Sequence, residues 1–431
     1  MRPIRTMFTL RNLAVLFWLG SSITIIVYVM VDRHWWDFDV YWKAVQSICH
    51  GSDPYADGIA VQQAFHDAAN KGRHAVQPMT YVYSPITLPL LRIAGRAPIE
   101  VVGTLYGLAL AGGFFLQLWA VWQMASASER RWLPLFLPAV MFFPGLMEDN
   151  VVMSANISYI LYGLVLAAAV SGWKHNRWRW YYAAVLLASC CKAPLLTLLA
   201  FPVLVGWRQW RAALATGVAG CALFTVQGWL WPVLFKEYLR AVQLQFDWNM
   251  DFGMGPAGIL GRALFKAGLP YSQPTTIVYL MFAAMVGLLL LWIAQRVKLM
   301  PEAREMWLPV ALVGTILLNP RVKEYDTAAI TVPMLLIGWR GLRQLVTPGL
   351  PVEEGRKLNV PLAVAGAGCF LAANLLGIDE AFSSVELALL LVLLGMGVWL
   401  TLKHAPEALQ LHCLPIHRKA ETADMDMISR V

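Results

Sequence analysis

Long uncharged apolar stretches recur along the whole of this 431-residue chain, separated by short polar segments. Four of the clearest are residues 12–31, 101–127, 360–378 and 387–402. Each is close to the roughly 20 residues that an α-helix needs to cross the hydrocarbon core of a bilayer. A soluble protein has no reason to repeat such segments, so the pattern predicts an all-α polytopic membrane protein.

Basic residues sit in small clusters between the apolar stretches. Lys and Arg are enriched in cytoplasmic loops, so these clusters mark the inner side and place both termini in the cytoplasm. On this path the chain has about twelve transmembrane helices, with residues 181–206 interpreted as a broken or hairpinned pair around Lys192. The predicted spans are 12–31, 98–123, 132–147, 157–172, 181–206, 212–232, 276–295, 306–318, 327–339, 360–377 and 384–402.

Two further segments complete the domain plan. A long polar loop at 32–81 follows the first span on the outer side, and this span is expected to be a retained anchor. Residues 83–95 are apolar but short and are followed closely by Arg96, so we predict a partly inserted or interfacial segment. If this segment crossed the membrane instead, the topology of the next spans would shift. Residues 1–403 are predicted to form one transmembrane domain, and 404–431 a polar, disordered cytoplasmic tail.

Composition supports the membrane assignment and removes other classes. Hydrophobic residues make up 58% of the chain and charged residues 14%, against about 25% charged residues in soluble domains. The net charge of +8 comes from clusters that flank spans, so it reports topology and excludes nucleic acid as a partner. The six cysteines show neither a disulfide framework nor zinc-site spacing. Walker A, GxSxG, HExxH and CxxC motifs do not occur, which leaves ATP-driven transport and common hydrolase chemistry without support.

Most of the remaining polar residues fall on the predicted outer side. They lie in five clusters, at 37–39, 148–156, 192, 247–251 and 321–326. Charges at the outer ends of spans are not needed for topology, and ionisable groups near the membrane are commonly functional. Any single cluster could be a solvated loop without a role, but the location of all five clusters on one side favours a functional site there.

The first outer motif is His34-Trp35-Trp36-Asp37-Phe38-Asp39-Val40-Tyr41. Trp and Tyr anchor at the membrane–water boundary, so both carboxylates are expected at headgroup height. A carboxylate there can accept a proton from a sugar hydroxyl. The Asp-x-Asp spacing is also compatible with a divalent metal that holds a nucleotide-sugar diphosphate. A further alternative is that both carboxylates lie at the interface without a catalytic role. The two side chains share a face on a strand but not on a helix.

Three more motifs follow on the outer side. In Tyr81-Val82-Tyr83-Ser84-Pro85 the proline keeps the residue before it extended, which gives either a shaped turn or a helix start. Lys192-Ala193-Pro194 breaks a helix beside a cation, which can contact a phosphate or snorkel to the interface. In the loop 318–326, Arg321 and Lys323 can neutralise a phosphate or pair with the acids Glu324 and Asp326 in a structural network.

These motifs, in this order, resemble glycosyltransferase family 87, the polytopic polyprenyl-phosphate-mannose-dependent mannosyltransferases of the membrane-embedded GT-C type. The family pattern of an Asp, then Val-Tyr, an Ala and Gly-x-x-x-Tyr has its counterparts in Asp37, Val40-Tyr41, Ala44 and Gly51-Ser52-Asp53-Pro54-Tyr55. A Tyr-Pro-Pro-like turn corresponds to Tyr83-Ser84-Pro85, with Pro89 beyond.

The later part of the resemblance is looser. Of a Gly-Gln-x-Asn element only Asn156 is kept, and a Lys-x-x-Pro element is one residue short at Lys192-Ala193-Pro194. Residues 319–326 stand where many members have a Ser-Trp-His-type loop. The resemblance covers about residues 32–340, and its departures bear on the donor lipid, the sugar and the acceptor more than on the fold.

The resemblance implies a GT-C glycosyltransferase in a bacterial inner membrane, with its active site on the periplasmic face. It would move a hexose, foremost mannose, from a polyprenyl-phosphate donor to an acceptor glycan or glycolipid, with inversion at the sugar carbon. Asp37 matches the essential aspartate and would deprotonate the acceptor hydroxyl. Cations would neutralise the departing phosphate, and the candidates rank as Lys192, Arg321 and Lys323.

The remaining predicted contacts to the substrate are Tyr83, Asn156, Asp39 and Tyr41. The family is expected to use no metal and no cofactor, which favours Asp37 as a base over Asp37 and Asp39 as metal ligands. A transporter or lipid flippase is the rival from another class. Such proteins show internal repeats and polar residues near the middle of several spans, whereas here no repeat is evident and the polar groups gather toward one side. A structural scaffold is a third reading, disfavoured by an outer loop rich in aromatic residues and carboxylates.

Overall fold

The computed structural model describes residues 35–69, 79–126, 129–131, 155–206, 208–249, 252–300, 303–346 and 382–403. Every regular element in these ranges is a helix, as the apolar pattern predicts. The predicted spans 12–31, 132–147 and 360–377, the outer residues 148–154 and the tail 404–431 lie outside the described residues.

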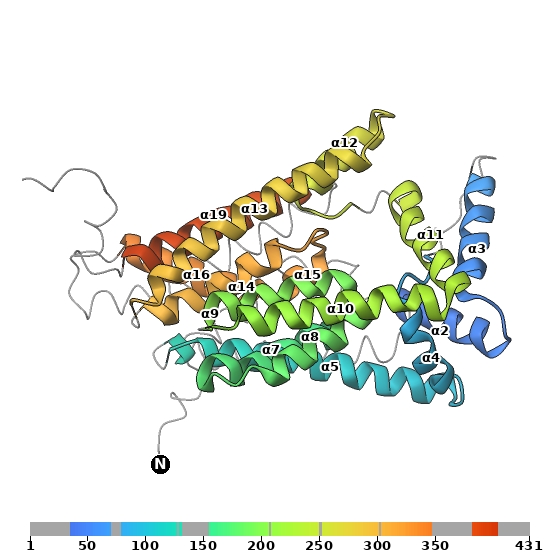
Figure 1. Ribbon diagram of the computed structural model, residues 1–431, viewed down its shortest axis with the longest axis horizontal. Coiled ribbons are helices and arrows are strands. Elements are labelled where there is room, and N and C mark those ends of the chain that lie inside the picture. The colour runs from blue at the N-terminus through green and yellow to red at the C-terminus, as the bar shows by residue number, and fades with distance from the viewer. Residues whose placement is uncertain are drawn as a thin grey trace, which may run out of the picture.

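Long helices run side by side along the longest axis of the molecule (Figure 1). Three of them, α5 (Ile99–Met124), α10 (Trp210–Leu230) and α13 (Ser272–Val297), are long and apolar enough to cross a membrane. Large apolar side chains on α10 and α13, such as Leu214 and Leu280, are exposed, which suits a lipid environment and not water. The chain is therefore a helical membrane protein, while the count of about twelve spans stays a prediction.

The helices α7 (Ser158–His175), α14 (Arg304–Leu317), α16 (Thr331–Val346) and α19 (Phe382–Lys403) pack against α5 or α13. Two of them carry most of the core: α14 is buried on nearly all sides from Trp307 to Leu317, and α16 from Thr331 to Gly341. Helices that are apolar all round belong in the middle of a bundle.

At one end of the molecule, α2 (Trp36–Cys49), α3 (Pro54–Ala69), α4 (Leu88–Ala94) and α11 (Pro232–Asn249) gather beyond the bundle (Figure 1, right). The described part of the predicted outer loop 32–81 is thus largely helical. The apolar segment after it forms a 3₁₀ turn, η2 (Pro85–Thr87), and the short α4. At about 1.5 Å per residue these are too short to cross a bilayer, in agreement with an interfacial segment.

The predicted break at Lys192 is present. Helix α8 (Arg179–Cys191) ends there, and Lys192 has extended backbone angles, φ −132° and ψ 97°. Pro194 lies at the start of the 3₁₀ helix η4 (Ala193–Leu199), which leads into α9 (Ala200–Val205). Because Pro194 has no backbone N–H to donate to a helix ladder, the sequence ends α8 close to this point.

Glycines let α5 and α7 approach each other closely. A Cβ atom built on Gly113 would lie 2.5 Å from the backbone oxygen of Tyr159, and one on Gly163 would lie 2.4 Å from the oxygen of Gly113. Small residues at such crossings are typical of membrane helix pairs. Gln117 of α5 reinforces the contact because its Nε2 donates to the Tyr159 carbonyl at 2.9 Å. The start of α7 is thereby fixed against α5.

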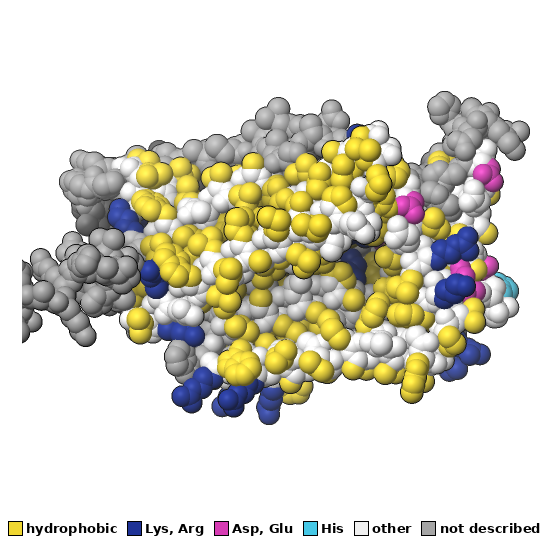
Figure 2. All heavy atoms as spheres, turned by 45° about the horizontal axis from the view of Figure 1, so that its top comes forward, with side chains coloured by type: hydrophobic (Ala, Val, Ile, Leu, Met, Phe, Trp, Pro, Cys, Tyr) yellow, Lys and Arg dark blue, Asp and Glu magenta, His cyan; other side chains and the backbone are white. Residues whose placement is uncertain are grey.

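The remaining helices and turns complete the outer side and the loop connections. Helix α12 (Pro256–Lys266) precedes α13, and α15 (Glu324–Thr327) with η6 (Ala328–Ile330) connects α14 to α16. The short η3 (Glu129–Arg131) follows α5 at the opposite, predicted cytoplasmic end. On the face shown in Figure 2, Lys and Arg side chains but no Asp or Glu side chains are visible at the left end, whereas acidic and basic side chains mix at the right.

Candidate active site

A cavity of about 380 Å³ lies where α2, the start of α7, the break at Lys192, α11 and the loop after α14 meet. Figure 2 shows a hollow among apolar side chains, with a Lys or Arg side chain in its depth. Six of the eight residues predicted as site residues line the cavity: Asp37, Tyr83, Asn156, Lys192, Arg321 and Lys323. Residues separated by up to 286 positions in the chain (323 − 37) thus line one cavity.

Asp37, Asn156 and Lys192 form a continuous chain of hydrogen bonds. The Asn156 side-chain amide donates to Asp37 Oδ2 at 2.8 Å, and Lys192 Nζ donates to Asn156 Oδ1 at 2.9 Å. Lys192 Nζ also donates to Ser158 Oγ at 2.6 Å. Asn156 is buried, while Asp37 and Lys192 are half-buried. The carboxamide therefore fixes a carboxylate and an ammonium group at a set spacing on the cavity wall.

The backbone before α7 aims Asn156 at its partners. Ala155 has φ +53°, a left-handed conformation that is uncommon for a residue with a Cβ atom. Tyr106 of α5 holds this residue by donating its hydroxyl to the Ala155 carbonyl at 2.7 Å. The Ser158 backbone N–H donates to Asn156 Oδ1 at 3.0 Å, which is a local Asx turn. Strained backbone of this kind persists where its surroundings fix it, and it is common at functional sites.

Asp39 and Tyr41, the other two predicted site residues, do not line the cavity. Since α2 begins at Trp36, Asp37 and Asp39 are two helical positions apart and leave the helix on different sides. Asp39 is exposed. This arrangement does not suit a metal held by both carboxylates. Among the described residues, no group of three or more His, Cys, Asp or Glu side chains is placed to hold a metal ion.

Tyr41 supports the cavity from behind. Its hydroxyl lies 2.7 Å from the hydroxyl of Tyr83 and accepts the Ile157 backbone N–H at 3.4 Å. Burial raises the pKa of Tyr41 and of Tyr83 well above the usual value, so both hydroxyls stay neutral. Ser84, between Tyr83 and Pro85, is extended as predicted, with φ −66° and ψ 154°. The turn presents the Tyr83 ring to the cavity.

The loop after α14 carries the two other cations. Arg321 donates its backbone N–H to Asn319 Oδ1 at 3.1 Å, and the backbone N–H of Lys323 donates to Asp326 Oδ2 at 2.9 Å. The other Asp326 oxygen accepts the Tyr162 hydroxyl at 2.7 Å. Asp326 therefore anchors the loop to α7, which is part of the structural network expected for this segment.

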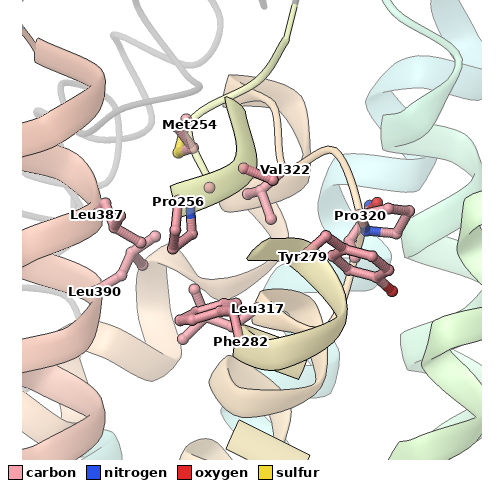
Figure 3. Close-up of a pocket in the computed structure, with 12 residues that line it drawn as sticks. Met254, Pro256, Tyr279, Phe282, Leu317, Pro320, Val322, Leu387 and Leu390 are labelled. Carbon is pink, nitrogen blue, oxygen red and sulfur yellow. The ribbon is translucent and has the colours of Figure 1, made fainter. Parts of the chain in front are cut away.

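The far side of this loop rests on apolar residues around a small pocket of about 10 Å³ (Figure 3). Val322 and Pro320 of the loop, Leu317 of α14, Phe282 of α13 and Leu387 of α19 line it. The Met254 backbone N–H donates to the Val322 carbonyl at 2.9 Å. The pocket is about the size of one water molecule, so it holds no substrate and serves to seat the loop.

Sequence reasoning missed several residues at the cavity. Ser158 holds Lys192, and the ring of Tyr325 lies 3.9 Å from Lys192 Nζ. Tyr238, Val242 and Gln245 of α11 also line the cavity. Ser158 and Tyr325 each stand two residues from a predicted site residue, but neither type is unusual in a membrane chain. An amphipathic pattern over 232–249 was the available signal for α11, with its amide residues and Asp247 toward the C-terminal end.

Comparison with known proteins identifies the family of the chain. The sequence model of glycosyltransferase family 87 matches residues 81–320, which is more than half of the chain. The chain belongs to glycosyltransferase family 87. It is accordingly a membrane glycosyltransferase. No curated protein matches the chain.

Six of the predicted site residues line the cavity, and the family 87 match includes three of these six, Tyr83, Asn156 and Lys192. Asp37 precedes the matched residues, and Arg321 and Lys323 directly follow them. The structure joins these flanking residues to the matched ones through the Asp37–Asn156 hydrogen bond and the shared cavity.

Proposed function

We propose that this family 87 glycosyltransferase moves a mannosyl group from a polyprenyl-phosphate donor to an acceptor glycan or glycolipid, with inversion. The observation that carries the proposal is the hydrogen-bonded chain Asp37–Asn156–Lys192 on the wall of a cavity that also contains Arg321 and Lys323. A carboxylate at Asp37 together with three cations suits a hydroxyl nucleophile and an anionic leaving group.

Asp37 is the proposed base. Its carboxylate accepts the acceptor's hydroxyl proton as the acceptor oxygen forms a bond to the sugar C1 atom. The bond from C1 to the phosphate oxygen breaks on the opposite face, and its electron pair leaves with the polyprenyl phosphate. The leaving group is a phosphate that already carries negative charge, so it needs cations and no proton donor. Cations preorganised in such a site each contribute roughly a few kcal/mol of transition-state stabilisation.

The proposed site faces the periplasm. The cavity lies at the end of the molecule where α2, α3, α4 and α11 gather. The turn η3 after α5, and the basic segment with Lys174, Arg177 and Arg179 between α7 and α8, lie at the opposite end. Positive residues mark the cytoplasmic side. In the proposed architecture, residues 1–403 act as one GT-C-type domain in a bacterial inner membrane.

The donor is tested with purified protein in detergent, supplied with a lipid and glycan extract of its source cells. Radiolabelled polyprenyl-phosphate mannose is compared with radiolabelled GDP-mannose. We expect label to enter a product only from the polyprenyl-phosphate sugar. Direct use of GDP-mannose would refute the lipid donor. Failure of mannose and of every other carrier-linked hexose would favour a transport function instead.

A further inference from the structure

We propose that Lys192 is a positioning residue for the base Asp37, and that Arg321 and Lys323 alone hold the donor phosphate. This inference rests on the proposed function. It changes the ranking of the three cations as candidates for binding the donor phosphate, in which the sequence placed Lys192 first. It follows from the contacts that the Lys192 ammonium group makes with the described residues.

The three N–H donors of a lysine ammonium group have a limited number of directions. At Lys192 two of them are used, toward Asn156 Oδ1 at 2.9 Å and Ser158 Oγ at 2.6 Å. The ring of Tyr325 lies 3.9 Å away from Nζ, and the ring of Tyr83 lies 5.6 Å away. Two oxygens and an aromatic face thus surround the charge. Two of the three donors of Lys192 are thus committed to side chains on the cavity wall.

In-line geometry also separates Lys192 from the phosphate. The sugar C1 atom must lie between the acceptor oxygen at Asp37 and the leaving phosphate oxygen. Lys192 is joined to Asp37 by a single carboxamide, so it lies on the side of the base. A cation for the phosphate belongs beyond the sugar, away from Asp37.

Arg321 and Lys323 are held apart from this chain of hydrogen bonds by a separate segment. Both line the cavity from the loop after α14, which is a different element from those that carry Asp37, Asn156 and Lys192. Their backbone N–H groups fix the loop through Asn319 and Asp326. A guanidinium group can bind two phosphate oxygens at once, and a lysine adds a second point charge.

The role of Lys192 follows from the bonding of Asn156. A carboxamide whose oxygen accepts from an ammonium group has a more strongly polarised N–H, and that N–H donates to Asp37. A nearby positive charge also favours the ionised carboxylate. Lys192 therefore keeps Asp37 oriented and charged without contact to the substrate.

Equilibrium binding of farnesyl phosphate, a short isoprenoid monophosphate, to purified protein separates the two roles. We expect Arg321→Met and Lys323→Met each to weaken binding about tenfold or more, the typical cost of losing a charge-assisted contact. Lys192→Met should weaken it less than about threefold, as should Lys236→Met, an exposed lysine of α11 that does not line the cavity.

Transfer kinetics supply the second readout. Lys192→Met should lower kcat about 100-fold while KM for the donor stays within about threefold, the range expected for an interaction that acts only on the chemical step. The acid limb of its pH profile should move to higher pH, because the base is more easily protonated once the cation is gone. Ser158→Ala keeps the lysine but removes one of its anchors, and should lower kcat with the same unchanged donor KM.

The outcomes are distinct. If Lys192→Met loses farnesyl phosphate binding as strongly as Arg321→Met and leaves the pH profile in place, Lys192 binds phosphate and the inference is overturned. If Lys192→Met fails to fold, Ser158→Ala decides: a raised donor KM with an unchanged kcat overturns the inference. If the wild-type protein binds no farnesyl phosphate, the lipid-phosphate donor itself is refuted, and this assignment with it.

Discussion

Asn156 is the residue on which the two charged groups of the site depend. It donates to Asp37 and accepts from Lys192 through one buried carboxamide. We expect Asn156→Asp, which is nearly the same size, to lower the rate of transfer about 100-fold, because a second carboxylate would repel Asp37 and lose the donor it needs. Initial rates of sugar transfer at equal protein abundance measure the effect. An unchanged rate would show that the Asp37–Asn156–Lys192 hydrogen bonds do not contribute to catalysis.

The sequence predicted most of the site at the residue scale because polar residues are costly in an apolar chain. Lys192, Arg321 and Lys323 stood out for that reason, and Asp37 and Asn156 through the resemblance to the family. Asp39, predicted as a substrate contact, does not line the cavity, since the spacing of two residues places it away from Asp37 once α2 is a helix. Ser158 and Tyr325 have no signal of their own, because only the fold brings them to Lys192.

At the scale of elements, the pairing of α5 with α7 positions Asn156. Gly113→Ala would place a Cβ atom 2.5 Å from the Tyr159 oxygen, whereas a Cβ on Gly112, its neighbour, meets nothing within 4 Å. We expect Gly113→Ala to destabilise the protein by about 1–3 kcal/mol and to lower transfer, since the helices must move apart. Gly112→Ala should leave stability unchanged or raise it, as alanine favours helix. Thermal unfolding in detergent compares the two, and equal midpoints would contradict the close packing.

A buried ion pair ties the predicted cytoplasmic end of α5 to α16. Arg340 Nε donates to Glu129 Oε1 at 2.5 Å and Nη2 to Oε2 at 2.8 Å, and both side chains are buried. Removing one partner leaves a buried charge, so Arg340→Met should destabilise the protein by about 3–5 kcal/mol. Arg343→Met, an exposed arginine of the same helix, should cost less than about 1 kcal/mol.

The same pair predicts a pH dependence of stability. Burial alone would raise the pKa of Glu129, but the hydrogen bonds and charge of Arg340 outweigh it and lower this pKa below the usual value. A lowered pKa in the folded state contributes stability above the pKa of an unfolded glutamate, and this stability is lost as the pH falls through the folded value. The unfolding midpoint of the wild type should therefore fall on acidification more than that of Glu129→Gln. Parallel curves would contradict the ion pair.

Elements were predicted unevenly from the sequence. The break at Lys192 and the long helices α5, α10 and α13 follow from proline chemistry and from apolar length, which act locally. Helices α2, α3 and α11 were not predicted, because segments on the outer side have mixed composition and lack the apolar length of a membrane span. Their helical form depends on packing against each other, as Tyr55 of α3 and Tyr238 of α11 show with ring centroids 5.8 Å apart.

At the scale of the whole molecule, the account requires the cavity to face the periplasm. Cys49 at the end of α2 is exposed and lies at the same end as the cavity, whereas Cys413 belongs to the predicted cytoplasmic tail. In spheroplasts, a membrane-impermeant maleimide should label Cys49 and should label Cys413 only after lysis. Cys49→Ser, which removes the outer thiol, is the control. Labelling of Cys49 only after lysis would reverse the proposed orientation.

The central chemical claim for the whole molecule is that Asp37 takes the proton of the acceptor hydroxyl during transfer from a lipid-linked sugar. The most direct measurement compares the wild type, Asp37→Asn and Asp39→Asn, at equal abundance in membranes, for transfer of label from polyprenyl-phosphate mannose. The account predicts that Asp37→Asn loses at least about 100-fold in rate, as expected for a removed general base, while Asp39→Asn retains most of its activity. Equal labelling by Asp37→Asn and the wild type would contradict it.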